Sequence, residues 1–236
     1  MEEFREKLRG YKETIEDELA SSAQQTKELE ARLMKAAQLW ADNTCIDFKE
    51  DEREEAEDLV IVFKERGCWA QLGRQGGWQF LSLGQDCDEI GIAAHEIGHA
   101  LGFWHTHSRH DRSQFVRVFR KNVQPDQIIQ YVKETRKTNN NYNLTYDYGS
   151  VMHYNARSFI TTEAELEGKY TMVSKDMTYM ETMGSHIIGF YDLLMMNMYY
   201  NCTDIGALQI CIDEMSEEEP PRSAVLLHRA LEYYEA

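Results

Sequence analysis

Residues that could bind a metal ion lie close together in the run His95-Glu-Ile-Gly-His-Ala-Leu-Gly-Phe-Trp-His105. His95 and His99 are four residues apart, so on a helix their imidazoles share one face. Nitrogens at this spacing can both reach one zinc ion at about 2.0–2.1 Å. Gly102 accepts the left-handed backbone that ends such a helix, and the chain then supplies a third nitrogen from His105. Three histidines leave a fourth ligand position open, which is typical of a catalytic zinc site.

The residue beside the first histidine, Glu96, is predicted to act as a general base on a zinc-bound water. A bare H-E-x-x-H motif arises by chance, but the glycine and the third histidine at these offsets make chance a poor explanation. The open three-histidine geometry and Glu96 also disfavour a purely structural zinc site.

The composition is that of a globular protein with one sizeable domain, or one domain with appendages. The chain has 236 residues, of which 42% are hydrophobic. Its net charge of −16 argues against a nucleic-acid or anionic-membrane partner, because phosphate binding requires a basic face. No apolar run is long enough for a transmembrane helix, and residues 1–20 lack the apolar stretch of a signal peptide.

The cysteines and sequons bear on the compartment. The five cysteines are Cys45, Cys68, Cys87, Cys202 and Cys211. An odd count without C-x-x-C pairs does not suggest a cysteine-bound metal. In an oxidising compartment the five cysteines would form two disulfides and leave one cysteine over. The alternative is a set of buried, reduced thiols. Two N-x-[ST] sequons, at Asn143 and Asn201, fit a secreted protein.

The elements that position the motif in the first half follow from periodicity. Apolar residues recur at steps of three and four through residues 1–34 and on to Trp40, which predicts an amphipathic helix. For residues 1–34 we consider a packed helix, a pro-segment or a partner-binding coil, and the composition favours a solvated helix with one apolar face. Short strands are predicted at 45–48, 59–63, 67–73 and 76–84, followed by the zinc-binding helix from about Ile90.

The second half has fewer regular elements. We expect a short strand at 115–118, a short helix that opens at Val123-Gln-Pro125, and a surface loop over 135–146. An apolar helix is predicted over 187–200. The acidic tail from Asp204 reads as a linker, in which residues 224–234 could form an isolated helix. The order of helix, strands and helix indicates an α+β fold.

A second motif, Ser150-Val-Met-His-Tyr154, follows downstream. The extended histidine motif followed by a methionine turn is the metzincin signature. Residues 35–202 resemble the astacin family of zinc endopeptidases throughout, in LWADNTCIDF, GCWAQLG, FLSLGQDC, HEIGHALGFWH, YDYGSVMHY and FYDLLMMNMYYNC. The resemblance implies a two-lobed α+β catalytic domain with a deep cleft. The N-terminal lobe would hold a twisted sheet and the zinc-binding helix, and the C-terminal lobe would be mostly irregular.

The resemblance also implies roles for particular residues. One Zn²⁺ would be held by His95, His99 and His105, with Tyr154 as an additional ligand that swings away to support the transition state. Glu96 would be the general base. The implied disulfides are Cys68–Cys87 and Cys45–Cys202, and we expect the thioether of Met152 to pack beneath the histidines as a hydrophobic floor.

The sequence departs from the family pattern in several places. Thr106 stands where the family commonly has a glutamate that partners the buried N-terminus of the mature enzyme. The usual first strand, which carries that N-terminus, is not recognisable, and residues 1–34 lack the pro-segment motif Phe-x-Gly-Asp. We therefore hypothesise that maturation through a new N-terminus does not operate here in the usual way. Ser113 and His110 replace a usual aspartate and proline, and we expect His107 and His110 at the surface.

Together these observations predict an extension over 1–34, an astacin-like catalytic domain over 35–205, and an acidic, flexible tail over 206–236. The predicted function is a secreted zinc-dependent endopeptidase that acts on proteins or peptides, with no nucleic-acid partner and no membrane insertion. The alternative is a zinc-binding interaction module with weak catalysis, which Thr106 and the missing strand motivate. Lys169 or Lys175 could favour acidic side chains just after the scissile bond. Cys211 could have lost a partner through truncation, remain a free thiol or form an intermolecular bridge.

Overall fold

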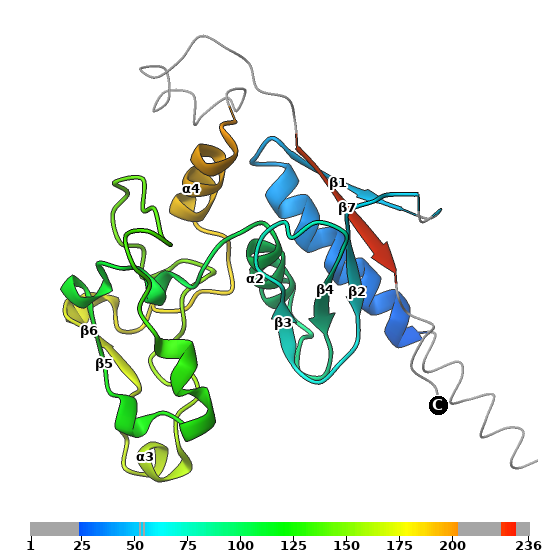
Figure 1. The fold of residues 1–236 in the computed structure, drawn as a ribbon. Coiled ribbons are helices and arrows are strands. Elements are labelled where there is room, and N and C mark those ends of the chain that lie inside the picture. The colour runs from blue at the N-terminus through cyan, green and yellow to red at the C-terminus, as the bar shows by residue number, and fades with distance from the viewer. Residues whose placement is uncertain (1–23, 52, 54, 203–222, 230–236) are drawn as a thin grey trace, which may run out of the picture.

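A computed structural model describes residues 24–51, 53, 55–202 and 223–229 of the chain. The chain folds into two lobes on either side of helix α2 (Ile90–Ala100), as Figure 1 shows. A sheet and a long helix over residues 24–41 form the N-terminal lobe with α2. The segments after α2 form the other lobe, in which short elements alternate with loops. The predicted α+β, two-lobed fold is confirmed.

The sheet of the N-terminal lobe has five strands among the described residues. In spatial order they are β1 (Ile46–Glu50), β7 (Ser223–Arg229), β2 (Leu59–Phe63), β4 (Trp78–Leu83) and β3 (Cys68–Ala70). Strand β3 is antiparallel to β4, and the other pairs are parallel. The four strands predicted before α2 are all present, with slightly different bounds.

The helix over residues 24–41 packs directly into the core of this lobe. Leu29 and Leu33 are buried, and the indole N–H of Trp40 donates to the carbonyl of Ala94 in α2 at 3.0 Å. For residues 24–34 the solvated helix that the composition favours is therefore wrong, and the packed helix is right. The helix also runs without a break across residue 34, where the sequence placed a domain boundary. The expectations for residues 1–23 lie outside the described residues.

The C-terminal lobe has its own core, built largely of aromatic rings and methionines. Its buried members are Val116, Val123, Tyr131, Tyr146, Tyr148, Met172 and Met183. This core includes residues of β5 (Val116–Val118) and β6 (Met172–Ser174), and α3 (Thr162–Leu166) lies between them in sequence. The last helix, α4 (Phe190–Tyr200), instead packs into the core of the N-terminal lobe through Met196. The 3₁₀ helices are η1 (Thr106–Ser108), η2 (Arg112–Gln114), η3 (Arg120–Asn122), η4 (Pro125–Tyr131) and η5 (Met177–Tyr179). The sequence predicted β5, η4 and α4, but not α3 or β6.

The tail contains the largest difference from the sequence prediction. Residues 223–229 form strand β7, where a helix over 224–234 was expected. The pairing partners of β7 lie far away in sequence, so local periodicity could not indicate them. Residues 203–222 and 230–236, with Cys211, lie outside the described chain.

Two disulfides tie the elements together. Cys45–Cys202 joins the start of β1 to the end of α4, and Cys68–Cys87 joins β3 to the turn before α2. Both pairings are those that the resemblance implies.

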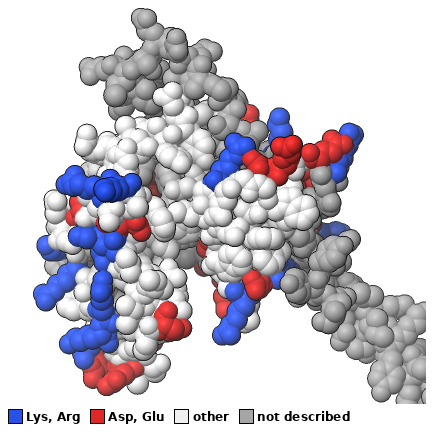
Figure 2. All heavy atoms as spheres, viewed as in Figure 1, with Lys and Arg blue, Asp and Glu red and all other residues white. Residues whose placement is uncertain are grey.

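Charged side chains are unevenly distributed over the molecule. Figure 2 shows a row of Lys and Arg side chains along the outer side of the C-terminal lobe, and the middle of this face is largely uncharged. No helix in the described part of the chain is both long and apolar enough to cross a membrane.

Candidate active site

Helix α2 carries the first two histidines and ends in a turn that brings in the third. At this turn Phe103 N–H donates to the carbonyl of Gly98 and Gly102 N–H to that of His99, each at 2.9 Å. Gly102 has a φ of +106°, the left-handed backbone that this kind of helix end requires. The chain reverses here, and His105 returns to the face of α2 that carries the other two histidines.

The three histidine side chains converge on one point. Nε2 of His105 lies 3.2 Å from Nε2 of His95 and 3.1 Å from Nε2 of His99. Two nitrogens bound to a tetrahedral zinc ion at about 2.0–2.1 Å would be about 3.4 Å apart. The spacing therefore fits three ligands of a single metal ion, and one ligand atom from each residue lies within 4.8 Å of the others.

The tautomers of the first two histidines follow from their outer nitrogens. Nδ1 of His95 lies 2.6 Å from the carbonyl oxygen of Val151, and Nδ1 of His99 lies 2.6 Å from that of Phe103. A carbonyl oxygen only accepts hydrogen bonds, so each Nδ1 carries the proton and each Nε2 presents a lone pair inward. Converging lone pairs repel one another, and a cation placed among them removes this repulsion. The donor set thus fits a metal.

Burial keeps the imidazoles in the form that binds metal. It lowers the pKa of all three histidines, that of His99 to about 3, and the neighbouring imidazoles lower the pKa of His99 and His105 further. Neutral imidazole is the ligand form of histidine, so the site is prepared for a cation at neutral pH.

Glu96 follows His95 directly in α2 and is only 4% exposed. Its Oε2 is buried and has no hydrogen-bond partner among the described residues. Burial raises the pKa of this carboxyl to about 8, and a nearby cation would lower it again. Such a group can both accept and release a proton near neutral pH.

The methionine turn supports α2 from below. Met152 is 1% exposed, and a Cβ added at Gly98 would lie 2.6 Å from its sulfur. Its carbonyl accepts a hydrogen bond of 2.9 Å from Thr106 N–H, one residue past the third histidine. Met152 therefore contacts the histidine helix and holds the loop that delivers His105, in agreement with the predicted hydrophobic floor.

Tyr154 places its ring against the third histidine. The ring centroids of Tyr154 and His105 are 4.4 Å apart, and Tyr154 stacks on His107 at 4.1 Å. Burial raises the pKa of the Tyr154 phenol well above its usual range, and the nearby Tyr131 raises it further. The hydroxyl therefore keeps its proton. Tyr154 and His95 line the same pocket of about 180 Å³, which His186 also borders.

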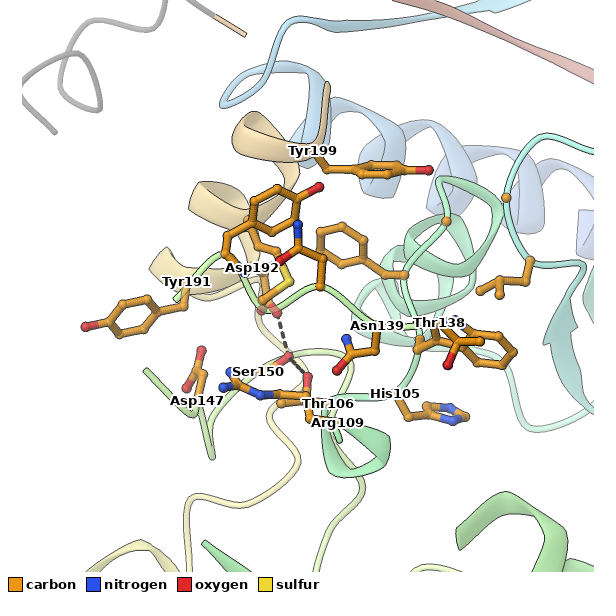
Figure 3. A pocket seen from close by; sticks show the side chains of 18 of the residues that line it. His105, Thr106, Arg109, Thr138, Asn139, Asp147, Ser150, Tyr191, Asp192 and Tyr199 are labelled. Atoms are coloured by element: carbon orange, nitrogen blue, oxygen red, sulfur yellow. Dashed lines mark hydrogen bonds between the residues drawn. The ribbon is translucent and has the colours of Figure 1, made fainter. Parts of the chain in front are cut away.

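A second pocket, of about 470 Å³, is lined by the third histidine, His105, and is drawn in Figure 3. Thr106 and Asp192 line it together with Ser150, and dashed lines in the figure join the three side chains. Thr106 Oγ1 lies 2.7 Å from Ser150 Oγ, and Ser150 donates to Asp192. Asp192 also accepts from the backbone N–H groups of Val151 and Gly189, each at 2.9 Å.

Two buried histidines were not identified as part of the site from sequence. His107, expected at the surface, is fully buried, and its Nε2 lies 3.0 Å from the carbonyl of Gln130. The expectation failed because the alternation of histidines after His105 carries no burial signal. His153 bonds through Nδ1 to the carbonyl of Tyr154 at 2.6 Å. Its position within the methionine turn was the available signal.

The remaining sequence candidates lie outside this arrangement. Lys175 donates from Nζ to the carbonyl of Ser113 at 2.6 Å, and Lys169 pairs with Glu167. Neither lysine lines either of the two pockets described above, so the suggested preference for acidic side chains gains no support here. His110 is partly buried and bonds to Asn139 at 2.9 Å.

A two-lobed α+β fold, a histidine helix followed by a third histidine, and a methionine turn beneath them define the metzincin class. The model of the peptidase family described as Astacin matches residues 7–201. The chain belongs to the astacin family.

Individual relatives agree with this assignment. The chain is 45% identical over 170 residues to zinc metalloproteinase nas-31 of Caenorhabditis elegans, covering 72% of this chain and 27% of the relative. It is 37% identical over 183 residues to zinc metalloproteinase nas-28 of the same organism, covering 76% and 36%. The chain thus spans about a quarter to a third of the length of these curated relatives.

Among solved structures, the chain is similar to high choriolytic enzyme 1, a hatching enzyme zinc-protease from the medaka fish Oryzias latipes. The TM-score is 0.66 at 31% identity, covering 75% of this chain and 84% of that one. Myroilysin shares the fold, with a TM-score of 0.52 at 17% identity and coverage of 72% and 85%.

Proposed function

We propose that this chain carries the catalytic domain of a zinc-dependent endopeptidase that hydrolyses internal peptide bonds of proteins or peptides. The observation that carries the proposal is the convergence of three neutral imidazole nitrogens beside a buried carboxyl. His95, His99 and His105 would hold one Zn²⁺ per chain. Zinc, when bound, lowers the pKa of a water molecule to about 7 and polarises a carbonyl group.

Glu96 is the proposed general base. Its buried carboxyl belongs to the same helix as His95 and His99, so it can take a proton from the attacking water and return it to the leaving amine. Tyr154, our proposed additional ligand, keeps its phenolic proton and can donate a hydrogen bond to the oxygen on which negative charge develops. The pocket shared by Tyr154 and His95 gives this donor and the metal position a common space.

We further propose that the protein acts outside the cell. The structure contains two disulfides, which persist in oxidising compartments. Asn143 and Asn201, the two sequon residues, are exposed and are proposed as glycosylation sites. The proposed partners are protein or peptide substrates.

The test compares the oxidatively folded chain with its Glu96→Ala variant on an internally quenched peptide blocked at both ends. Only an endopeptidase cleaves such a peptide. Zinc content, measured by elemental analysis, should be equal in the two proteins because Glu96 is not a ligand, while cleavage should fall by at least a hundredfold in the variant. A His99→Ala control should lose zinc and activity together. If the parent binds zinc yet cleaves nothing, the endopeptidase proposal is wrong and the interaction-module alternative takes its place.

A further inference from the structure

Strand β7 occupies an interior position of the N-terminal sheet although it comes from the far end of the chain. It lies between β1 and β2, as the red arrow in Figure 1 shows, and is parallel to both. Its register with β1 runs from Ile46↔Ser223 to Glu50↔Leu227. Its register with β2 runs from Val60↔Leu227 to Val62↔Arg229. Strands β1 and β2 follow each other in sequence but are separated in the sheet by β7.

The neighbouring strands depend on this position being filled. Among the described strands, β1 pairs only with β7, and β2 pairs with β7 on the side away from β4. Ile46, Val60 and Val62 are all less than 9% exposed, so this part of the sheet is buried. If β7 left, two facing rows of backbone N–H and C=O groups would lose their partners, a cost that folded proteins avoid.

The disulfide Cys45–Cys202 holds the end of α4, where the tail begins, beside the start of β7. The Cα atoms of the two cysteines are 5.4 Å apart, and the residue after Cys45, Ile46, pairs with Ser223. Residues 203–222 therefore connect two points that lie close together. Because this linker joins the two points covalently, β7 can pair with β1 of the same molecule. The effective concentration of the strand beside β1 is therefore high.

The sequence of the segment suits an interior strand. Residues 223–229 read Ser-Ala-Val-Leu-Leu-His-Arg, without proline or an acidic residue. Two prolines, Pro220 and Pro221, precede it, where they do not interrupt the ladder. The tail before them is strongly acidic, so the strand is an apolar segment at the end of a charged linker.

We infer that residues 223–229 are an obligatory interior strand of the N-terminal lobe, supplied by the chain's own tail between β1 and β2. The consequence reaches the candidate site, because β3 and β4 pack on α2 and the carbonyl of His99 accepts a 2.9 Å hydrogen bond from Gly73 N–H, in the loop after β3. The tail thus supports the sheet on which the histidine helix rests. This inference does not depend on the proposed catalytic activity.

A register-specific cross-link tests the pairing. Lys49 is exposed and pairs with Leu226, so Lys49→Cys with Leu226→Cys, on a Cys211→Ser background, should form an intramolecular disulfide. The control pair, Lys49→Cys with Ala224→Cys, is two residues out of register, and its Cα atoms should be too far apart to bridge. Peptide mapping and non-reducing gels read the result. Failure of the in-register pair to bridge overturns the inference, as does equal bridging by the control. Cross-linked dimers would show that a second copy supplies the strand.

Hydrogen exchange provides a second measurement that does not require a new bond. Leu226→Pro removes a backbone N–H within β7, and Gln209→Pro places the same residue in the linking segment. We expect amides of β1 to exchange about tenfold faster or more in Leu226→Pro than in Gln209→Pro, while amides of β5 and β6 are unchanged. Equal protection of β1 in both variants would overturn the inference.

Discussion

Thr106 Oγ1 lies 2.7 Å from Ser150 Oγ, and this hydrogen bond links the loop after the third histidine to the methionine turn. The Ser150 hydroxyl in turn donates a hydrogen bond to the carboxylate of Asp192 in α4. The family's usual glutamate at position 106 is thus replaced by a hydroxyl that joins an existing network. Asp192 already has donors from Ser150, Val151 and Gly189. Asp192 thus has three hydrogen-bond donors among the described residues, and our hypothesis on maturation stays a prediction.

Replacing Thr106 with valine removes this hydroxyl at nearly constant shape. We expect Thr106→Val to lower the free energy of unfolding by about 1–2 kcal/mol, because Ser150 loses a hydrogen-bond partner in a buried place. Thr106→Ser keeps the hydroxyl and should cost less. Urea denaturation of the three proteins measures the difference, and a valine variant as stable as the parent would argue against the network.

Asp192 should give the protein a distinctive pH dependence. Burial raises its pKa in the folded protein to about 6, above the value of about 3.9 in an unfolded chain. The folded state then binds more protons than the unfolded state between these pH values, so the free energy of unfolding falls as pH rises from about 4 to about 6. From pH 4 to pH 7, the parent should lose about 2 kcal/mol relative to Asp192→Asn.

Denaturant unfolding of both proteins across this range tests the sign, and any loss of metal at low pH cancels in the comparison. Asp176→Asn is the matched control. Its carboxyl is exposed, and a hydrogen bond from the Thr178 side chain lowers its pKa. The parent should therefore gain stability with pH relative to that variant. A parallel response of the two variants would contradict the assignment.

Contact between α2 and the methionine turn leaves no room for a side chain at position 98. A Cβ at Gly98 would lie 2.6 Å from the sulfur and 3.3 Å from the terminal carbon of Met152. We expect Gly98→Ala to destabilise the protein by about 1–3 kcal/mol through overpacking. Gly149→Ala, whose Cβ would meet nothing closer than 3.5 Å, is the control.

A double-mutant cycle identifies the source of this strain. Shortening the side chain in Gly98→Ala/Met152→Ala should make the two losses of stability less than additive. Strict additivity, measured by thermal or denaturant unfolding, would mean that the sulfur is not what the new methyl group meets.

The two disulfides should contribute unequally to stability. Cys45–Cys202 closes a sequence separation of 157 residues and Cys68–Cys87 one of 19. The loop-entropy model gives about 5 kcal/mol for the first and about 3 kcal/mol for the second. Guanidinium unfolding of the two double-alanine variants measures this order. The reverse order would show that factors other than loop length dominate.

Local sequence patterns predicted much of this molecule. The histidine helix, the end of that helix at Gly102 and five of the strands follow from spacing and residue type within a few residues. The convergence of His95, His99 and His105 was predictable for the same reason. Their roles as ligands, and those of Glu96 and Tyr154 in catalysis, stay predictions, as does the division at residues 34 and 205.

What the sequence did not indicate depends on contacts between distant segments. Strand β7 pairs with residues more than a hundred positions away, and no local pattern encodes such a partner. The burial of His107 comes from Tyr131 and Tyr154, which pack around it from later segments. From sequence alone, Leu29 and Leu33 fit the apolar face of a solvated helix. They are buried because residues of the sheet, distant in sequence, belong to the same core.

The position of Cys45–Cys202 has a consequence for a backbone cut in the C-terminal lobe. Arg136 and Lys137 are exposed in the loop over 135–146, so a trypsin-like protease can reach them. A cut after either residue leaves His95, His99 and His105 on one fragment and Met152 and Tyr154 on the other. The disulfide joins the two fragments covalently. The nicked molecule therefore keeps all of its site residues together, runs as a single species without reductant, and separates into two only when this bond is reduced.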